Sequence, residues 1–159
     1  MTLVIRNGQK ADIPVIAHLI RELARFEKLE DEVSMTEDLL TRNLFGPHHY
    51  AETLIAEKAG KPIGFALFFH TFSTFLGKPG LYLEDLFVIP EERGNGVGRA
   101  LLRQLASIAL ERECGRLEWA VLDWNRDAIR FYERLGAKPN SEWTVYRLAG
   151  EALTALGRE

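Results

Sequence analysis

Apolar residues recur three or four positions apart from Ile13 to Phe26, which is the spacing of one face of an α-helix. Asp12 stands where a helix N-cap is expected, so the helix is predicted to begin there and to continue to about residue 28. A second helix is predicted to begin at Ser34 or Thr36, because two acidic residues follow in what would be its first turn.

The pattern changes to that of strands in the middle of the chain. The segment TLIAEKAGKPIGFALFFHTFSTFLGKPGLYLEDLFVIP is rich in aromatic and aliphatic residues and is interrupted by two turn sequences containing Gly and Pro. It predicts three antiparallel strands. Shorter strands are predicted at LVIR, RLEWAVLDW and EWTVYRL.

Helical spacing returns between these strands, from Val97 to Gly115 and again around Phe131, with a short helical tail after the last strand. The predicted order is therefore β-α-α-β-β-β-α-β-α-β. This is an α/β (α+β) chain with a mixed, mostly antiparallel sheet flanked by helices. A length of 159 residues suits a single domain spanning 1–159.

Composition narrows the classes of function. The chain is 47% hydrophobic and 27% charged, as expected of a globular protein, and its net charge of −3 gives no reason to expect a nucleic-acid partner. The lone cysteine, Cys114, excludes an internal disulfide, and no secretion signal or membrane span is recognisable. We therefore expect a cytoplasmic protein without a membrane partner.

A glycine-rich segment, ERGNGVGRALL, follows a predicted strand and opens a predicted helix. Backbone N–H groups at such a helix start can converge on a phosphate, and Arg93 and Arg99 add positive charge. The loop has Gly98-Arg99-Ala100 where a Walker loop needs Gly-Lys-Ser or Gly-Lys-Thr. A dinucleotide-binding loop is disfavoured because the preceding strands are antiparallel. A flexible turn remains the alternative interpretation of the loop alone.

Two motifs together resemble the GNAT acetyltransferase superfamily. Arg93-Gly94-Asn95-Gly96-Val97-Gly98 is similar to its acetyl-CoA loop, and NRDAIRFYERLGA, about 30 residues later, is similar to its second signature. The resemblance implies the GNAT fold with six or seven strands, acetyl-CoA as cosubstrate and no metal. It further implies cofactor contacts along Leu86, Phe87 and Val88, at the loop Arg93, Gly94, Asn95, Gly96, Val97, Gly98 and Arg99, and at Asn125.

Acetyl transfer to an amine needs a base, because an alkylammonium loses its proton only near pH 10, and an acid near the departing thiolate. Glu84 and Asp85 interrupt an apolar strand, and strand alternation predicts that they lie on opposite faces. Pairing with an arginine or a bulge would also explain them. By the resemblance, Glu84 is the general base through water and Tyr132 is the acid, whereas a tyrosine at this spacing is ordinarily a core residue.

The resemblance is closest to the spermidine/spermine (diamine) and thialysine acetyltransferase branch, through LIRELARFEKLEDEV, FLGKPGLYLEDLFV and VLDWNRDAIRFYERLGA. Ser73 and Phe75 stand where polyamine enzymes of this branch have Asp and Trp, so a short diamine or a lysine analogue such as thialysine becomes an equally good acceptor. The residues expected to bind the amine are Glu27, Ser73, Phe75, Glu84 and Asp85. The resemblance also implies a homodimer.

Two other functions remain open from the sequence. One is a CoA-binding module without turnover, although Glu84 and Tyr132 would then have no use. The other is an acetyltransferase that acts on a peptide or protein amine. His48 and His49 lack a third ligand for a metal site, and Cys114 is expected to be an inert structural residue.

Overall fold

The computed structural model describes residues 2–159 and divides the chain into two units. The first unit ends at Ala120 and contains the sheet with three helices, and the second begins at Val121 and contains two helices. Within residues 2–159, none of the helices combines the length and the apolar character that a membrane crossing requires.

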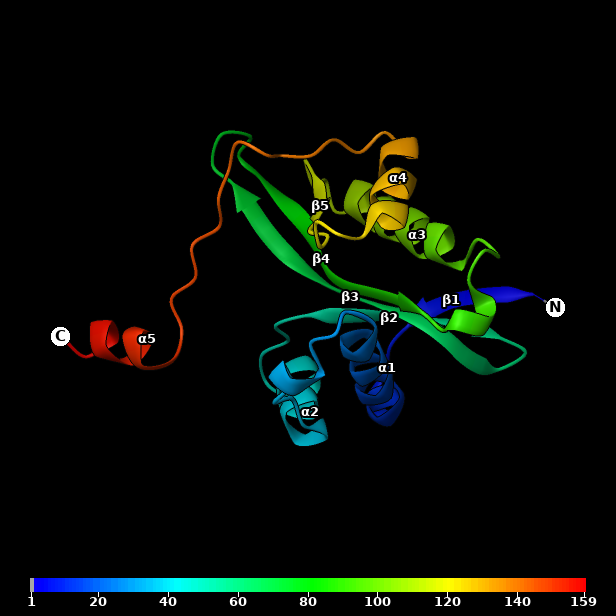
Figure 1. The fold of residues 1–159 in the computed structure, drawn as a ribbon, viewed down its shortest axis with the longest axis horizontal. Coiled ribbons are helices and arrows are strands. Elements are labelled where there is room, and N and C mark those ends of the chain that lie inside the picture. Colours follow the sequence, from blue (N-terminus) through cyan, green and yellow to red (C-terminus); the bar gives the residue numbers. More distant parts are fainter. Residues whose placement is uncertain (1) are drawn as a thin grey trace. The chain divides into compact units, whose positions relative to one another are not determined.

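The first unit is built on one five-stranded sheet in the order β1-β2-β3-β4-β5 (Figure 1). Strands β1 to β4 pair antiparallel with their neighbours, and β5 pairs parallel to β4. The predicted run of three antiparallel strands is confirmed by β2, β3 and β4. The strands are β1 (Leu3–Asn7), β2 (Glu52–Lys58), β3 (Lys61–Ser73), β4 (Lys78–Val88) and β5 (Leu117–Trp119).

Helices cover both faces of this sheet. Figure 1 shows α1 (Ile13–Phe26) and α2 (Glu37–Phe45) on one face and α3 (Val97–Glu111) on the other. Thr36 caps α2, because its Oγ1 accepts a hydrogen bond from the N–H of Leu39 at 3.1 Å. Three short 3₁₀ turns complete the unit, at Lys10–Asp12, Glu30–Glu32 and Pro90–Glu92.

The core lies between the sheet and these helices. Phe65 of β3 is fully buried, and the residues that cluster with it on the α1 face are Ile16, Leu19, Leu23, Ile55 and Phe87. On the opposite face, α3 buries Leu101 and Leu105 completely. Burying each large apolar side chain contributes about 1.5–3 kcal/mol, so this packing holds α1 and α3 against the two faces of the sheet.

A partly buried ion pair fixes the start of α1. The guanidinium of Arg6 donates two hydrogen bonds of 2.8 Å to the carboxylate of Asp12 and one of 3.0 Å to Glu57. Asp12 also accepts the N–H of Gln9 at 2.7 Å, and the contact with Arg6 lowers the pKa of the Asp12 carboxyl. Asp12 therefore stands at the N-cap as predicted, but its side chain ties the helix start to the sheet rather than capping the helix.

The second unit contains α4 (Arg126–Arg134) and α5 (Gly150–Gly157). The sixth strand predicted at EWTVYRL is wrong for the isolated chain, because residues 143–149 form neither helix nor strand. The sheet of the described residues has five strands rather than six or seven. A strand needs a neighbour for its backbone hydrogen bonds, and the second unit contains no strand that could pair with this segment.

Candidate active site

Strand β4 contains a β-bulge at Glu84. Leu83 pairs with Phe68 and Asp85 pairs with Leu67, so Glu84 is an extra residue without a partner on β3. The Glu84 side chain is exposed. A carboxylate at the centre of an apolar strand is therefore tolerated here because the bulge keeps it in contact with solvent.

The bulge also changes which face the later residues of β4 occupy. Asp85 is the cross-strand partner of Leu67, which packs on the α1 side of the sheet, and Phe87 belongs to the same cluster. Leu86 lies toward α3, since a Cβ built on Gly98 would be 3.8 Å from its Cδ2. Strict alternation, on which the expectation of opposite faces for Glu84 and Asp85 rests, is thus interrupted between them.

Three carboxylates influence one another at this point. Asp85 has a pKa raised to about 6, first by burial and then by the negative charges of Glu84 and Glu27. Burial also raises the pKa of Glu27, which follows the last residue of α1. Neither Asp85 nor Glu27 has an ion pair with a basic residue among residues 2–159. The cluster suits a cation that comes from outside the chain.

One edge of β4 is open beyond the bulge. Pairing with β5 ends at Leu83 opposite Trp119, whereas pairing with β3 continues to Val88. The N–H of Ile89 donates to Ile63 of β3, and hydrogen-bonding direction alternates along a strand. The backbone groups of Leu86 and Val88 therefore face the open edge, and no other strand of the described residues pairs with them there.

The glycine-rich loop leads into α3 in a conformation that requires glycine. Gly94 and Gly96 both have φ of 81°, in the left-handed region, and a Cβ built on either would meet no atom within 4 Å. In the part of the chain that the structure describes, no side chain caps the start of α3 at Val97. The first N–H groups of this helix thus lack a side-chain acceptor, which is the donor arrangement that an anion such as a diphosphate needs.

The arginine that precedes these glycines is engaged elsewhere. The Nε of Arg93 donates to the carbonyl of Val88 at 3.0 Å, and its Cζ lies 4.7 Å from the ring centroid of Phe26 and 5.1 Å from that of Phe87. Sequence reasoning assigned Phe26 only to the packed face of α1 and missed this contact. Only its position at the end of the apolar stripe, where α1 leaves the core, could have indicated it.

Neighbouring residues of the loop differ in their contacts. The amide of Asn95 donates to Glu92 at 3.3 Å, and Glu92 forms an ion pair of 3.1 Å with Lys58 of β2. Arg99 is exposed on the first turn of α3. Arg99 and Asn95 are both predicted to bind the cofactor. The side chain of Arg99 is at the surface, whereas that of Asn95 forms a hydrogen bond within the loop.

The second unit carries the other two predicted site residues. Asn125 is the N-cap of α4, where its Oδ1 accepts the N–H of Ala128 at 3.3 Å. Tyr132 lies on α4 with its ring centroid 5.6 Å from that of Phe131. Their contacts with a cofactor stay predictions.

The β3–β4 hairpin carries the remaining predicted acceptor residues. The hydroxyl of Ser73 accepts the N–H of Leu76 at 3.1 Å, so it stabilises the turn. Phe75 is 98% exposed at the tip of the hairpin. The structure brings Glu27, Glu84 and Asp85 together, whereas it places Ser73 and Phe75 at the far end of the same strand pair.

Other polar groups do not form a metal site. Within residues 2–159, no three His, Cys, Asp or Glu side chains are grouped as metal ligands. The ring of His48 lies 6.0 Å from that of Tyr50. Cys114 is a free thiol after the last turn of α3.

Comparison with known proteins agrees with these features. Residues 16–137 match the model of the Acetyltransferase (GNAT) family. A thialysine N-epsilon-acetyltransferase of Bos taurus is 38% identical over 97% of this chain and 96% of its own length, and the L-ornithine N5-acetyltransferase NATA1 of Arabidopsis thaliana is 31% identical over 97% and 87%. An integron cassette protein from the mobile metagenome of V. cholerae has a similar structure, with a TM-score of 0.84, 29% identity and coverage of 100% and 99%. The chain is therefore a member of the acetyltransferase (GNAT) family.

Proposed function

We propose that this protein is an acetyl-CoA-dependent N-acetyltransferase that acts on a primary amine of a small molecule by direct attack in a ternary complex. The observation that carries the proposal is the bulge at Glu84, which presents an exposed carboxylate beside the open edge of β4. Family membership and the small-amine activities named for the two curated relatives support the same reaction.

The residues at the open edge fit the cosubstrate. Acetyl-CoA supplies an activated acetyl thioester when it is bound. The backbone groups of Leu86 and the N–H of Val88 can pair with its amide-containing arm. The N–H groups at the uncapped start of α3, after Gly94 and Gly96, can donate to its diphosphate. Arg99 adds a positive charge at the same helix start.

Glu84 is the proposed base. An alkylammonium substrate must lose a proton before its nitrogen can attack, and Glu84 accepts that proton through a water molecule. Asp85 and Glu27 attract the cationic amine to the cluster, and its positive charge in turn favours their ionised forms. Tyr132 then donates its phenolic proton to the sulfur of the leaving thiolate. The attacking nitrogen loses its second proton as the intermediate collapses, and that proton restores the phenol of Tyr132. The proton held at Glu84 passes to solvent, so one ammonium and one thioester give one amide, one thiol and one proton.

The acceptor is proposed to be a short diamine or an amino acid with a terminal side-chain amine. Thialysine and ornithine, the substrates named for the relatives, both carry such an amine. Neither Ser73, whose hydroxyl holds a turn, nor Phe75, which is exposed, has a carboxylate for a second ammonium of a long polyamine. The proposal further includes action as a single domain, as a homodimer and in the cytoplasm.

An amine panel tests the proposed function. The intact chain is incubated with acetyl-CoA and putrescine, spermidine, lysine, ornithine, thialysine or a short peptide, and thiol release is measured together with CoA binding by calorimetry. We expect turnover to be greatest with thialysine, ornithine or putrescine. Tight CoA binding without acetylation of any amine would instead favour a CoA-binding module, and turnover confined to the peptide would favour a protein acetyltransferase.

A further inference from the structure

Arg93 contacts three parts of the first unit at once. Its backbone begins the glycine-rich loop, its Nε donates to the carbonyl of Val88 at the open edge of β4, and its guanidinium lies over Phe26 at the end of α1. The guanidinium of Arg93 also lies over the ring of Phe87, which is only 4% exposed and belongs to the core on the α1 face.

The contact of Arg93 with Phe26 lies next to the acidic cluster of Glu27, Glu84 and Asp85. Phe26 is the last residue of α1 and directly precedes Glu27, whose charge raises the pKa of Asp85. Phe26 is 40% exposed, so apolar burial alone holds it less firmly than the core residues of the same helix. A guanidinium over an aromatic face adds a directional attraction at such a site.

The hydrogen bond with Val88 anchors the guanidinium of Arg93 to β4. Val88 is 8% exposed and is held in the sheet by its pairing with Gly64. A planar group anchored at Nε and stacked on two rings has little freedom to turn. Arg93 thus connects β4 to the final turn of α1 through its contacts with Val88 and Phe26.

We propose that Arg93 is a positioning residue that holds the Phe26–Glu27 end of α1 against β4, and thereby sets the distance of the acceptor-binding carboxylates from the cosubstrate edge. This inference rests on the proposed function. It assigns Arg93 a role in binding the amine, in place of the direct charge on the diphosphate that its position in the loop first indicates. Lysine cannot replace it, because an ammonium has neither the planar surface nor the Nε donor.

Enzyme kinetics with a double-mutant cycle test the role. In Phe26→Leu and Arg93→Lys, we expect the KM for the amine to rise about three- to tenfold, and in Phe26→Leu the Kd for CoA to change less than about twofold. The double variant should be no worse than Arg93→Lys alone, because both changes remove one interaction. Phe26→Tyr, which keeps the aromatic face, should restore the KM.

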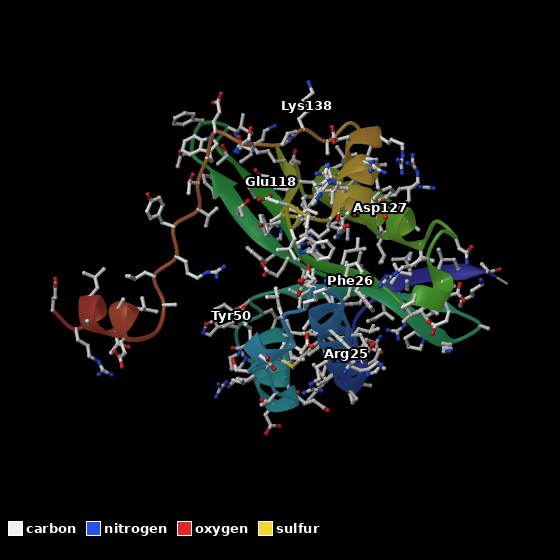
Figure 2. All side chains as sticks on the ribbon, viewed as in Figure 1. Arg25, Phe26, Tyr50, Glu118, Asp127 and Lys138 are labelled. Atoms are coloured by element: carbon white, nitrogen blue, oxygen red, sulfur yellow. The ribbon has the colours of Figure 1, made fainter. Side chains whose placement is uncertain are left out.

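The control is Arg25→Lys, the same substitution one residue from Phe26 on α1 (Figure 2). Among residues 2–159, the ion pair of Arg25 is with Glu22 of its own helix, so the KM of Arg25→Lys for the amine should match that of the unchanged protein. An unchanged KM in Phe26→Leu, or multiplied effects in the double variant, would overturn the inference.

A spectroscopic measurement separates failure of this inference from failure of the proposed function. Because the guanidinium of Arg93 lies over the rings of Phe26 and Phe87, we expect their ring currents to shield its Nε–H proton. In a ¹⁵N-labelled sample, Phe26→Leu should therefore move that resonance downfield, while Arg25→Lys leaves it in place. If the shift is observed but no amine is acetylated, the contact of Arg93 with Phe26 is present and the proposed function is wrong. If the resonance does not move in Phe26→Leu, the contact itself is absent and this inference is wrong.

Discussion

Adjacent residues of β4 carry the same chemical group in different surroundings. Glu84 is exposed at the bulge, whereas Asp85 is largely buried beside two other carboxylates and has a pKa raised from 3.8 to about 6. The folded chain therefore binds the proton of Asp85 more tightly than the unfolded chain does. This contribution to stability is complete below about pH 3.8 and is lost as the pH rises to about 6.

Replacing Asp85 tests this directly. Asp85→Asn removes a buried charge, so we expect it to raise the free energy of unfolding of the ligand-free protein by about 1–2 kcal/mol at pH 7.5 and by little at pH 4. Urea denaturation of both proteins at the two pH values measures the difference. Asp31→Asn, at an exposed residue of the 3₁₀ turn Glu30–Glu32, should show no such pH dependence. Equal gains at both pH values would contradict the burial of the Asp85 charge.

The proposed catalytic pair makes a separate prediction. Glu84→Gln should lower kcat about 100-fold or more and Tyr132→Phe about tenfold or more, because each removes a proton-transfer group while it preserves shape. Both variants should bind CoA with unchanged affinity in calorimetry. Turnover at the original rate in both proteins would exclude these roles.

Sequence reasoning found the carboxylates but not their arrangement. Glu84 and Asp85 are recognisable as charges in an apolar strand, and a bulge was one explanation of them. Which residue is extra depends on how β4 pairs with β3, a relation between distant segments that no local pattern contains. For the same reason the contact of Arg93 with Phe26, 67 positions apart in the sequence, could not be predicted.

The start of a helix can be predicted well from the sequence, because it depends on residues within one short segment. The helices α1 and α2 begin within a residue or two of their predicted starts, because capping residues and apolar spacing act within a single turn. Strand β5 is different. Nine residues were predicted and only Leu117–Trp119 form the strand, since its length depends on where β4 stops pairing with it.

The loop before α3 makes a prediction at this scale. Gly96→Ala places a Cβ in open space but in a left-handed conformation, at a cost of about 1 kcal/mol that the chain can relieve by moving the loop. We expect the CoA affinity to fall at least about fivefold. Gly60→Ala is a matched control, because Gly60 has φ of 73° and an equally open Cβ position in the β2–β3 turn. Calorimetry that shows the same CoA affinity in both variants would argue against a diphosphate site at α3.

For the whole molecule, the segment EWTVYRL is the clearest departure from the sequence prediction. Trp143, Val145 and Tyr146 are 76%, 90% and 94% exposed, although aromatic and β-branched residues of this kind are typical of a strand. Such a pattern requires a neighbouring strand that the described residues do not provide within the second unit. A second copy of the chain, in keeping with the proposed homodimer, would supply one.

The proposed homodimer leads to a prediction about association. The unchanged protein should sediment as a dimer at micromolar concentration, and Val145→Lys should weaken the dimer by placing a charge on the exposed apolar segment. Leu110→Lys, at a residue 78% exposed on α3, serves as the control and should stay dimeric. Sedimentation equilibrium that finds only monomers of the unchanged protein would refute this arrangement.

Substitution and deletion at position 84 have different consequences because Glu84 is the extra residue of a bulge. Any substitution at position 84 alters the chemistry but keeps the number of residues, so Asp85, Phe87 and the turn into α3 keep their faces. Loss of the codon would instead remove the bulge and join Leu83 to Asp85, whose partners Phe68 and Leu67 are already adjacent on β3, so Phe87 keeps its face while the exposed carboxylate disappears. Relatives that lose activity through drift are therefore expected to keep the buried residues of β4 in place whether they change the side chain at position 84 or lose that residue altogether.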